Sequence, residues 1–304
     1  MNAPDLSRLR PRLPSPLEPV ADERFARHGL TLLLKRDDLI HPDLPGNKWR
    51  KLALNLREAA GRPVLTFGGA YSNHLRAAAA AGRLLGFPTV GVVRGDELAG
   101  RPLNPSLARC AADGMRLVFV DRATYRTKHE PDTLARILTL AEAPEGTYVV
   151  PEGGSNALAV HGCVELGREL AGRADVAVVA CGTGGTLAGL AAGFGGRTLG
   201  VPVLKGGFLG AEVRALQETA FGGPRGDWSL DERFHGGGYA RVPPALAAFA
   251  QDFEARHRAR HGLAIERLYV AKMLYGLVTL AAEGAFAPGT RIAAVITGSP
   301  DGTA

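Results

Sequence analysis

Blocks of apolar residues separated by amphipathic stretches dominate this chain, and they predict buried strands that alternate with helices. Buried strands are predicted throughout 63–69, 88–95 and 116–120 and at the starts of 30–39, 147–156, 175–193 and 291–300. Helices are predicted at the end of 175–193 and at 22–28, 48–60, 72–86, 104–113, 131–141, 158–170, 244–261 and 269–283. This alternation predicts an α/β fold with open, mostly parallel, twisted sheets flanked by helices on both faces.

The pattern is weaker in three places. Residues 1–20 hold five prolines and are expected to wrap the surface without a regular helix. Short strands are expected at 200–204 and 208–211, whereas 222–244, rich in glycine, proline and charge, is expected to be mostly loop. The whole chain has 304 residues, a length that suggests two domains.

Composition and charge narrow the class of protein. The chain is 46% apolar and 22% charged, as in an ordinary globular protein, and its net charge is +6. Basic residues form no dense run, which argues against a nucleic-acid partner and favours a mild attraction for anionic ligands. The three cysteines match neither a zinc spacing nor a disulfide framework, so no metal is expected. A polar N-terminus and the lack of a long apolar run predict a cytoplasmic protein without a membrane partner.

The segment PGNKWRKL, residues 45–52, carries the first candidate for chemistry. It places Lys48 in the first turn of a predicted helix, where the helix dipole and the neighbouring Arg50 and Lys51 all favour the neutral amine. A neutral lysine amine attacks carbonyl carbons and forms a Schiff base, so Lys48 is a candidate for covalent catalysis. On this segment alone, a solvated lysine on a helix surface is the alternative interpretation.

Four predicted strands end in glycine-rich or polar turns, and the carboxyl ends of parallel strands lie at one edge of a sheet. The most specific turn is CGTGGTLAG, residues 181–189. Its glycines allow the backbone to approach an anion, its threonines add hydroxyl donors, and a helix begins there. The residues predicted to bind a phosphate are Gly182, Thr183, Gly184, Gly185 and Thr186. The turn is neither a Walker A loop nor the dinucleotide fingerprint, and a purely structural turn is the alternative.

Two other turns precede helices. In GGAYSNH, residues 68–74, Ser72 is either a helix cap or a residue that faces the ligand, and Asn73 is a candidate donor. His74 either titrates near neutral pH or holds a structural hydrogen bond. In EGGSNA, residues 152–157, a structural helix cap is expected, with contact to substrate as the alternative.

Five segments occur in the order found in the 1-aminocyclopropane-1-carboxylate deaminase / D-cysteine desulfhydrase family: GNKWRKL, GGAYSNH, PEGGSN, CGTGGTLAG and LYVAKMLYGL. The chain resembles this family from about Leu34 to Gly302. The resemblance implies pyridoxal 5'-phosphate (PLP) as cofactor and the two-domain, tryptophan-synthase-β-like architecture of fold type II PLP enzymes. It places residues 52–153 in a smaller domain and residues 1–51 and 154–304 in a larger, cofactor-binding domain. It also implies a homodimer.

The resemblance implies roles for individual residues. Lys48 resembles the lysine that binds the cofactor through a Schiff base, and Lys51 resembles the second lysine beside its phosphate. Asn73 resembles the donor to the ring hydroxyl, and Ser72 the serine placed over the substrate. The other carried-over residues are Gly182, Thr183, Gly184, Gly185 and Thr186 in the phosphate loop, the active-site tyrosines Tyr239 and Tyr269, and Thr297 near the pyridine nitrogen.

Position 270 departs from the family pattern. The deaminases of the family carry glutamate after the tyrosine and the desulfhydrases usually threonine, whereas this chain has Val270, which offers the pyridine nitrogen no hydrogen bond. Thr297 or Ser299 is expected to compensate. Without a carboxylate here, we expect β-elimination from a D-cysteine-like amino acid, giving keto acid, ammonia and sulfide, in preference to opening of a cyclopropane ring.

Other functions stay open at this point. One alternative is a 1-aminocyclopropane-1-carboxylate deaminase, and another is a racemase or dehydratase on the same cofactor scaffold. A third alternative, favoured by Val270, is a protein that binds PLP or another phosphoanion with weak or no turnover. In each enzymatic case the partner expected is a small amino acid.

Overall fold

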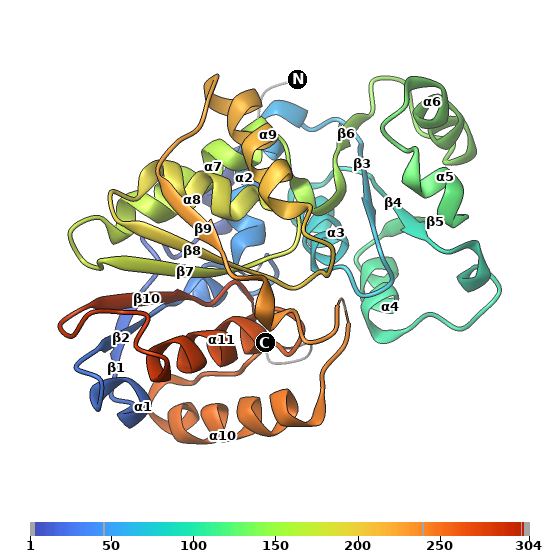
Figure 1. Ribbon diagram of the computed structural model, residues 1–304. Helices are drawn as coiled ribbons and strands as arrows, with labels where there is room; N and C mark the ends of the chain where they lie inside the picture. Colours follow the sequence, from blue (N-terminus) through green and yellow to red (C-terminus); the bar gives the residue numbers. More distant parts are fainter. Residues whose placement is uncertain (1–3, 45, 239, 299, 301–304) are drawn as a thin grey trace.

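The computed structural model describes residues 4–44, 46–238, 240–298 and 300, and its strands form two sheets (Figure 1). The larger sheet has the strand order β1-β2-β10-β7-β8-β9, and the smaller sheet has the order β5-β4-β3-β6. The larger sheet contains β1 (Leu17–Val20), β2 (Thr31–Lys35), β7 (Val176–Cys181), β8 (Arg197–Pro202), β9 (Asp227–Leu230) and β10 (Arg291–Val295). The smaller sheet contains β3 (Val64–Gly68), β4 (Thr89–Arg94), β5 (Met115–Val120) and β6 (Tyr148–Val150).

All strand pairs are parallel except β1 with β2. The central strand β7, with the sequence VAVVAC, is buried along its whole length, as expected when helices cover both faces of a parallel sheet. Successive side chains of this strand enter different cores, because Val178 packs in one cluster and Val179 in the other. The α/β fold with open, mostly parallel sheets is therefore confirmed.

Helices cover both faces of each sheet (Figure 1). On the larger sheet, α7 (Ala157–Leu170), α8 (Gly185–Gly193) and α9 (Leu209–Phe221) pack on one face, and α1 (Glu23–Ala26), α10 (Pro244–His261) and α11 (Val270–Ala282) pack on the other. On the smaller sheet, α2 (Asn47–Ala59), α3 (Asn73–Leu85) and α4 (Pro105–Ala112) pack on one face, opposite α5 (Arg122–Arg126) and α6 (Pro131–Leu140). Short 3-10 helices occupy Leu6–Leu9, Asp37–Leu39, Asp96–Leu98, Glu152–Gly154 and Glu232–Phe234. No helix in the described ranges is long and apolar enough to span a membrane.

Helix α2 lies between the two sheets and touches both parts of the molecule. Trp49, Leu52 and Leu56 pack in the core of the smaller sheet. Its other side lies against α7, where a Cβ at Gly162 would come within 2.1 Å of the carbonyl oxygen of Arg50. The contact between these helices therefore requires glycine at this position.

One expectation about the weaker segments is wrong. Residues 208–211 are not a strand but the start of α9, whose buried residues Leu209, Val213 and Gln217 repeat with a helical period of four. The other two hold, because 222–244 is mostly loop and residues 4–20 contain no α-helix, although each segment also contains a short strand that was not predicted. The segment 222–244 contains β9, which forms an edge of the larger sheet. The proline-rich N-terminus contains β1, an antiparallel edge strand, where proline is tolerated.

Candidate active site

The loops that follow β3, β7 and β10 border one cavity of about 230 Å³, together with the first turn of α2. Such a position, beyond the carboxyl ends of parallel strands, is the usual ligand site of open α/β sheets. The predicted residues that line the cavity are Lys48, Lys51, Ser72, Asn73, Gly182, Thr183, Gly184, Gly185, Thr186, Tyr269 and Thr297. Tyr239, also predicted, lies outside the described residues.

A tight turn at Gly46 delivers Lys48 to the cavity. Gly46 has a φ of 65°, and its N–H donates to the carbonyl oxygen of Asp37 at 2.9 Å. The N–H of Asn47 donates to the carbonyl oxygen of Thr297 at 3.2 Å. A Cβ at position 46 would lie 1.7 Å from that same Thr297 oxygen, so only glycine fits. The turn thereby fixes the start of α2 against the loop after β10.

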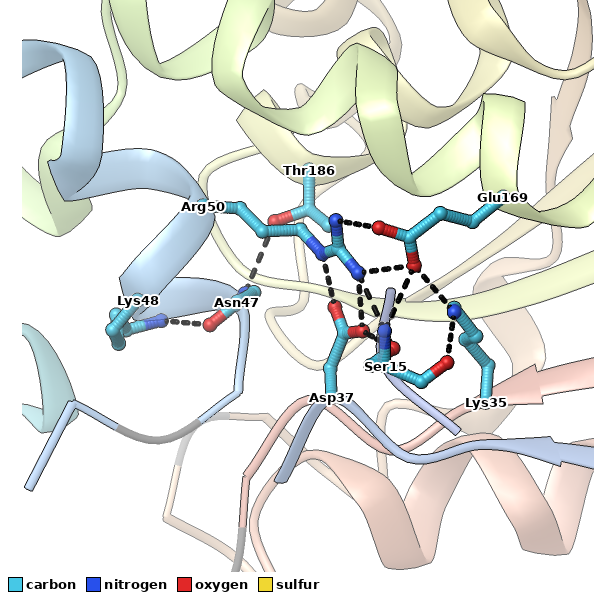
Figure 2. Close-up of polar contacts among 8 residues, drawn as sticks. All are labelled: Ser15, Lys35, Asp37, Asn47, Lys48, Arg50, Glu169 and Thr186. Atoms are coloured by element: carbon cyan, nitrogen blue, oxygen red, sulfur yellow. Dashed lines mark hydrogen bonds and ion pairs between the residues drawn. The ribbon is translucent and has the colours of Figure 1, made fainter. Parts of the chain in front are cut away.

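The environment of Lys48 favours its neutral amine. Burial is the main cause that lowers the pKa of Lys48 to about 7, and the nearby ammonium of Lys51 lowers it further. Lys48 Nζ donates to Asn47 Oδ1 at 2.6 Å, and Asn47 Nδ2 donates to Thr186 Oγ1 at 3.0 Å (Figure 2). The amine is therefore partly neutral at physiological pH and is tied to the glycine-rich loop after β7.

Arg50 does not act as the sequence predicted. Its guanidinium turns away from Lys48 and bonds both oxygens of Asp37 at 2.8 Å and the carboxylate of Glu169 at 2.9 to 3.0 Å (Figure 2). Lys35 Nζ lies 2.5 Å from Glu169, and Ser15 Oγ donates to Asp37 at 2.6 Å. This buried ion cluster ties α2 to β2 and α7.

The glycine-rich loop before α8 has the features of an anion-binding cradle. Gly184 caps α8 with a φ of 82°, and no side chain caps the helix start, so its first N–H groups are left for a ligand. Lys51 Nζ donates to Ser155 Oγ at 2.7 Å and to Thr183 Oγ1 at 3.3 Å. Burial lowers the pKa of Lys51 only to about 8. Its ammonium is therefore still mostly charged near neutral pH.

Ser155 contacts this cradle, although a structural helix cap was expected for the segment 152–157. Its Oγ lies 2.5 Å from Thr183 Oγ1, and a Cβ at Gly185 would lie 3.0 Å from it. The neighbouring Asn156 is the actual cap of α7, since its side chain accepts from the Ala159 N–H at 2.9 Å. Ser155 therefore joins the loop of 152–157 to the anion cradle.

The start of α3 presents a second polar surface to the cavity. Ser72 caps the helix by accepting from the Leu75 N–H at 3.3 Å, and Asn73 lines the cavity beside it. His74 is buried and bonds Thr66 through Nε2 at 2.8 Å. Burial, together with the charge of Lys51, holds the pKa of His74 well below its usual range. Of the two readings of His74, the structural hydrogen bond is confirmed and titration near neutral pH is wrong.

The N-terminus of α11 closes the cavity on the remaining side. Tyr269 lies against the cradle, because a Cβ at Gly182 would be 3.2 Å from its ring. Glu266, which sequence reasoning missed, accepts hydrogen bonds from the N–H groups of Leu268 and Tyr269 at 2.7 Å. Val270 is fully buried in the core of the larger sheet and does not line the cavity, whereas Thr297 does.

These residues fit a ligand with a phosphate and an aldehyde. Glycines, threonine hydroxyls, a helix N-terminus and the ammonium of Lys51 provide the donors for the phosphate. The partly neutral amine of Lys48 is chemically able to attack an aldehyde carbon. The fold and the site thus define a protein that binds a phosphorylated aldehyde. The family described as pyridoxal-phosphate dependent enzymes matches residues 11–298. The chain belongs to this family, and pyridoxal phosphate is its cofactor.

Individual relatives agree with the resemblance seen in the sequence motifs. A putative 1-aminocyclopropane-1-carboxylate deaminase of Thermotoga maritima is 30% identical over 275 residues, which cover 84% of this chain and 85% of the relative. A D-cysteine desulfhydrase of Yersinia pestis is 38% identical over 182 residues, or 54% of this chain and 53% of the relative. The crystal structure of an ACC deaminase homologue, in which ACC stands for 1-aminocyclopropane-1-carboxylate, superimposes with a TM-score of 0.78. It is 26% identical and covers 98% of this chain and 94% of that one. The resemblance to the deaminase and desulfhydrase family is confirmed.

Proposed function

We propose that the protein catalyses β-elimination from a small, D-cysteine-like amino acid and releases keto acid, ammonia and sulfide. The observation that carries this proposal is the state of the carboxylates at the cavity. Glu152 bonds Lys128 at 3.1 Å, and Glu266 accepts hydrogen bonds from the backbone at the start of α11. Among the described cavity residues both carboxylates are thus engaged, and Thr297 offers a neutral hydroxyl.

A neutral hydroxyl favours one of the two reactions named for the relatives. When bound, pyridoxal phosphate withdraws electrons from the α-carbon of the substrate, and the partner of its ring nitrogen sets how strongly. A neutral hydroxyl at the ring nitrogen gives weaker electron withdrawal than a carboxylate. Weaker electron withdrawal suffices for the departure of a good leaving group such as sulfide, but it disfavours cleavage of a carbon–carbon bond. Deamination of 1-aminocyclopropane-1-carboxylate is the second candidate, because relatives with both names match the chain.

The proposal assigns the cofactor to residues that surround the cavity. Lys48 bonds its aldehyde carbon, Asn73 donates to its ring hydroxyl, and Thr297 faces its ring nitrogen. Lys51 and the cradle hold its phosphate. The full proposed set is Lys48, Lys51, Asn73, Gly182, Thr183, Gly184, Gly185, Thr186 and Thr297.

Proton transfer and substrate contact are assigned to the groups that border the cofactor. Lys48, with a pKa of about 7, is a base able to take a proton from the substrate at neutral pH. Ser72 Oγ accepts its capping bond from the Leu75 N–H, which leaves its own hydrogen to donate to a substrate carboxylate. Tyr269 and Tyr239 are proposed to contact the substrate.

The larger organisation is proposed on the same family grounds. All four strands of the smaller sheet lie within residues 52–153, which supports a small domain there and a large domain formed by 1–51 and 154–304. Closure of the small domain over the cavity would exclude water from the reacting carbon. A homodimer and a cytoplasmic location complete the proposal.

A panel of D- and L-amino acids, assayed for keto acid, ammonia and sulfide, tests the reaction. D-Cysteine is expected to give pyruvate, ammonia and sulfide in equal amounts. Release of 2-oxobutanoate and ammonia from 1-aminocyclopropane-1-carboxylate, with no sulfide from any cysteine, would replace the proposal with its second candidate. Loss of optical activity without keto acid would identify a racemase. A cofactor-loaded protein that is inert to the whole panel would identify a binding protein.

A further inference from the structure

The cavity contains one cation for which neither the cofactor nor the proposed reaction has a use. Arg94 is the last residue of β4; it is exposed and lines the cavity. The neighbouring strand β3 pairs Gly68 with Val93, so the loop after β3 lies beside Arg94. A Cβ at Gly69 would be 3.9 Å from Arg94 Nη2. The guanidinium therefore borders the loop that leads to Ser72.

A buried aromatic ring holds the guanidinium at the cavity. Arg94 Cζ lies 5.9 Å from the centre of the Tyr125 ring. Tyr125 is 3% exposed, and its ring packs edge-on against Phe67 with 6.2 Å between the ring centres. The ring cannot move far, so the cation–π contact limits the positions of the guanidinium. Although Arg94 is exposed, this contact favours positions of its guanidinium beside the Tyr125 ring.

Among the described residues that line the cavity, neither carboxylate pairs with Arg94. Lys128 lies over the same Tyr125 ring at 4.3 Å but is neutralised by Glu152 at 3.1 Å. Glu266 is occupied by backbone N–H groups. Throughout the ranges that the structure describes, no carboxylate lies within 4.0 Å of Arg94.

The two anions required by the proposed function have other donors. The cofactor phosphate has the cradle and Lys51. The α-carboxylate of an amino acid has the start of α3, where Ser72 and the first N–H groups of the helix face a ligand. Arg94 is thus left over for a third negative group, one that belongs to the substrate side chain.

We propose that Arg94 selects amino acids whose side chain carries a negative charge beyond the β-carbon. This inference rests on the proposed function, since it assumes that the cavity receives an amino acid. It deepens that function by naming the substrate class: a small amino acid whose leaving group on the β-carbon carries a negative charge. The guanidinium recognises the charge by hydrogen bonds that a neutral isostere cannot replace.

Aspartate and asparagine test this inference, because they have nearly the same shape and differ in side-chain charge. Each enantiomer of both is titrated into the cofactor-loaded protein by calorimetry. For at least one enantiomer, aspartate is expected to bind about tenfold more tightly than asparagine, the gain of one charge-assisted hydrogen bond at a partly exposed site. Arg94→Gln is expected to bring that ratio close to one and to leave asparagine binding nearly unchanged.

Arg101→Gln is the matched control, since Arg101 is exposed, does not line the cavity and carries the same charge. It is expected to keep the wild-type ratio. An equal loss of affinity for aspartate and asparagine in Arg94→Gln would identify Arg94 as an α-carboxylate contact and overturn the inference. A wild-type ratio of one, or a ratio that Arg94→Gln leaves intact, would also overturn it. Failure of the proposed function is seen separately, as the absence of sulfide from every cysteine in the amino-acid panel.

Discussion

The guanidinium of Arg76 donates from Nη2 to Oδ1 of Asn73, one turn earlier on α3. A guanidinium has only donors, so this contact fixes the side-chain amide of Asn73 with its oxygen toward Arg76. The amide NH2 group is then left to donate into the cavity that Asn73 lines. Arg76 thereby orients the residue proposed to bind the ring hydroxyl of the cofactor.

Replacing Arg76 should weaken cofactor binding without removing a direct contact. In Arg76→Gln the new side chain both donates and accepts, so the Asn73 amide is free to flip, and the affinity of the apoprotein for PLP is expected to fall about tenfold. A titration followed by the visible absorbance of the bound cofactor measures it. Arg76→Lys, which keeps a donor-only side chain, is the control and should retain most of the affinity. Equal affinities for both variants and wild type would contradict the orienting role.

Covalent attachment of the cofactor should depend on the protonation of Lys48. Only the neutral amine attacks an aldehyde, so the rate of attachment to the apoprotein is expected to rise with pH through a midpoint near 7. After borohydride reduction, mass spectrometry should find the cofactor on Lys48 in wild type and on no lysine in Lys48→Ala. Lys51→Ala, the control, should still carry the cofactor covalently but require more of it for saturation. A reduced cofactor on another lysine in Lys48→Ala would refute the assignment.

The same lysine should make the apoprotein less stable at neutral than at alkaline pH. The pKa of Lys48 falls from an ordinary value of 10.5 to about 7 on folding, so between these values the unfolded chain binds more protons and stability rises with pH. Lys48→Met is therefore expected to raise the free energy of unfolding at pH 7 by roughly 2 kcal/mol, allowing for partial solvent screening. The gain should shrink steadily toward pH 10 in urea unfolding experiments. A gain that does not change with pH would contradict the linkage.

The ion cluster beneath α2 should be far more sensitive to substitution than surface ion pairs. Burial alone would raise the pKa of Glu169, but Arg50 and Lys35 reverse the shift and keep it ionised. Glu169→Gln leaves these two buried cations with a single carboxylate, Asp37, and is expected to cost about 3 to 5 kcal/mol of stability. Glu142→Gln removes an exposed partner of Arg116 and should cost about 1 kcal/mol or less. Urea unfolding of both apoproteins measures the two changes in the free energy of unfolding. Similar changes would show that the residues of the cluster are not energetically coupled.

Two glycines with positive φ differ in the space around an added Cβ: it is open at Gly61 and filled by backbone at Gly46. Gly61→Ala introduces a side chain at a φ of +80° into open space and is expected to cost about 1 to 2 kcal/mol while sparing cofactor affinity. Gly46→Ala has a φ of +65° and also a contact of 1.7 Å with the backbone of Thr297. It should displace the first turn of α2 and lower both stability and PLP affinity. Thermal unfolding and cofactor titration distinguish the two variants, and unchanged affinity in Gly46→Ala would contradict the role of the turn.

Sequence patterns were sufficient for the elements that have strong local signals. The parallel strands 63–69 and 88–95 are apolar runs bounded by glycine and proline, and both are confirmed as β3 and β4. The turns after four predicted strands were expected to converge because the carboxyl ends of parallel strands lie at one edge of a sheet, and residues of these turns line one cavity. Local chemistry and topology thus predicted where the site lies, whereas the family resemblance supplied the expected roles of most of its residues.

The features that were missed depend on contacts between distant segments. Ser155 reads as a helix cap in sequence, and only its approach to Thr183 makes it part of the cradle. The start of α9 looks like a short strand when four residues are read alone, whereas its helical repeat extends to Gln217. Arg50 lies two residues from Lys48 in sequence but on another face of α2, where it bonds Asp37 and Glu169. The prediction that Arg50 favours the neutral amine of Lys48 relied on sequence distance alone and missed this orientation.

The composition of the ion cluster also restricts how this sequence can drift during evolution. Its members come from positions 15, 35, 37, 50 and 169, and each satisfies a buried group of another. A single replacement leaves a charge stranded away from water, so a lineage that loses one member must change a second at nearly the same time. Substitutions at these five positions are accordingly expected to be inherited in pairs, although none of the five lines the cavity.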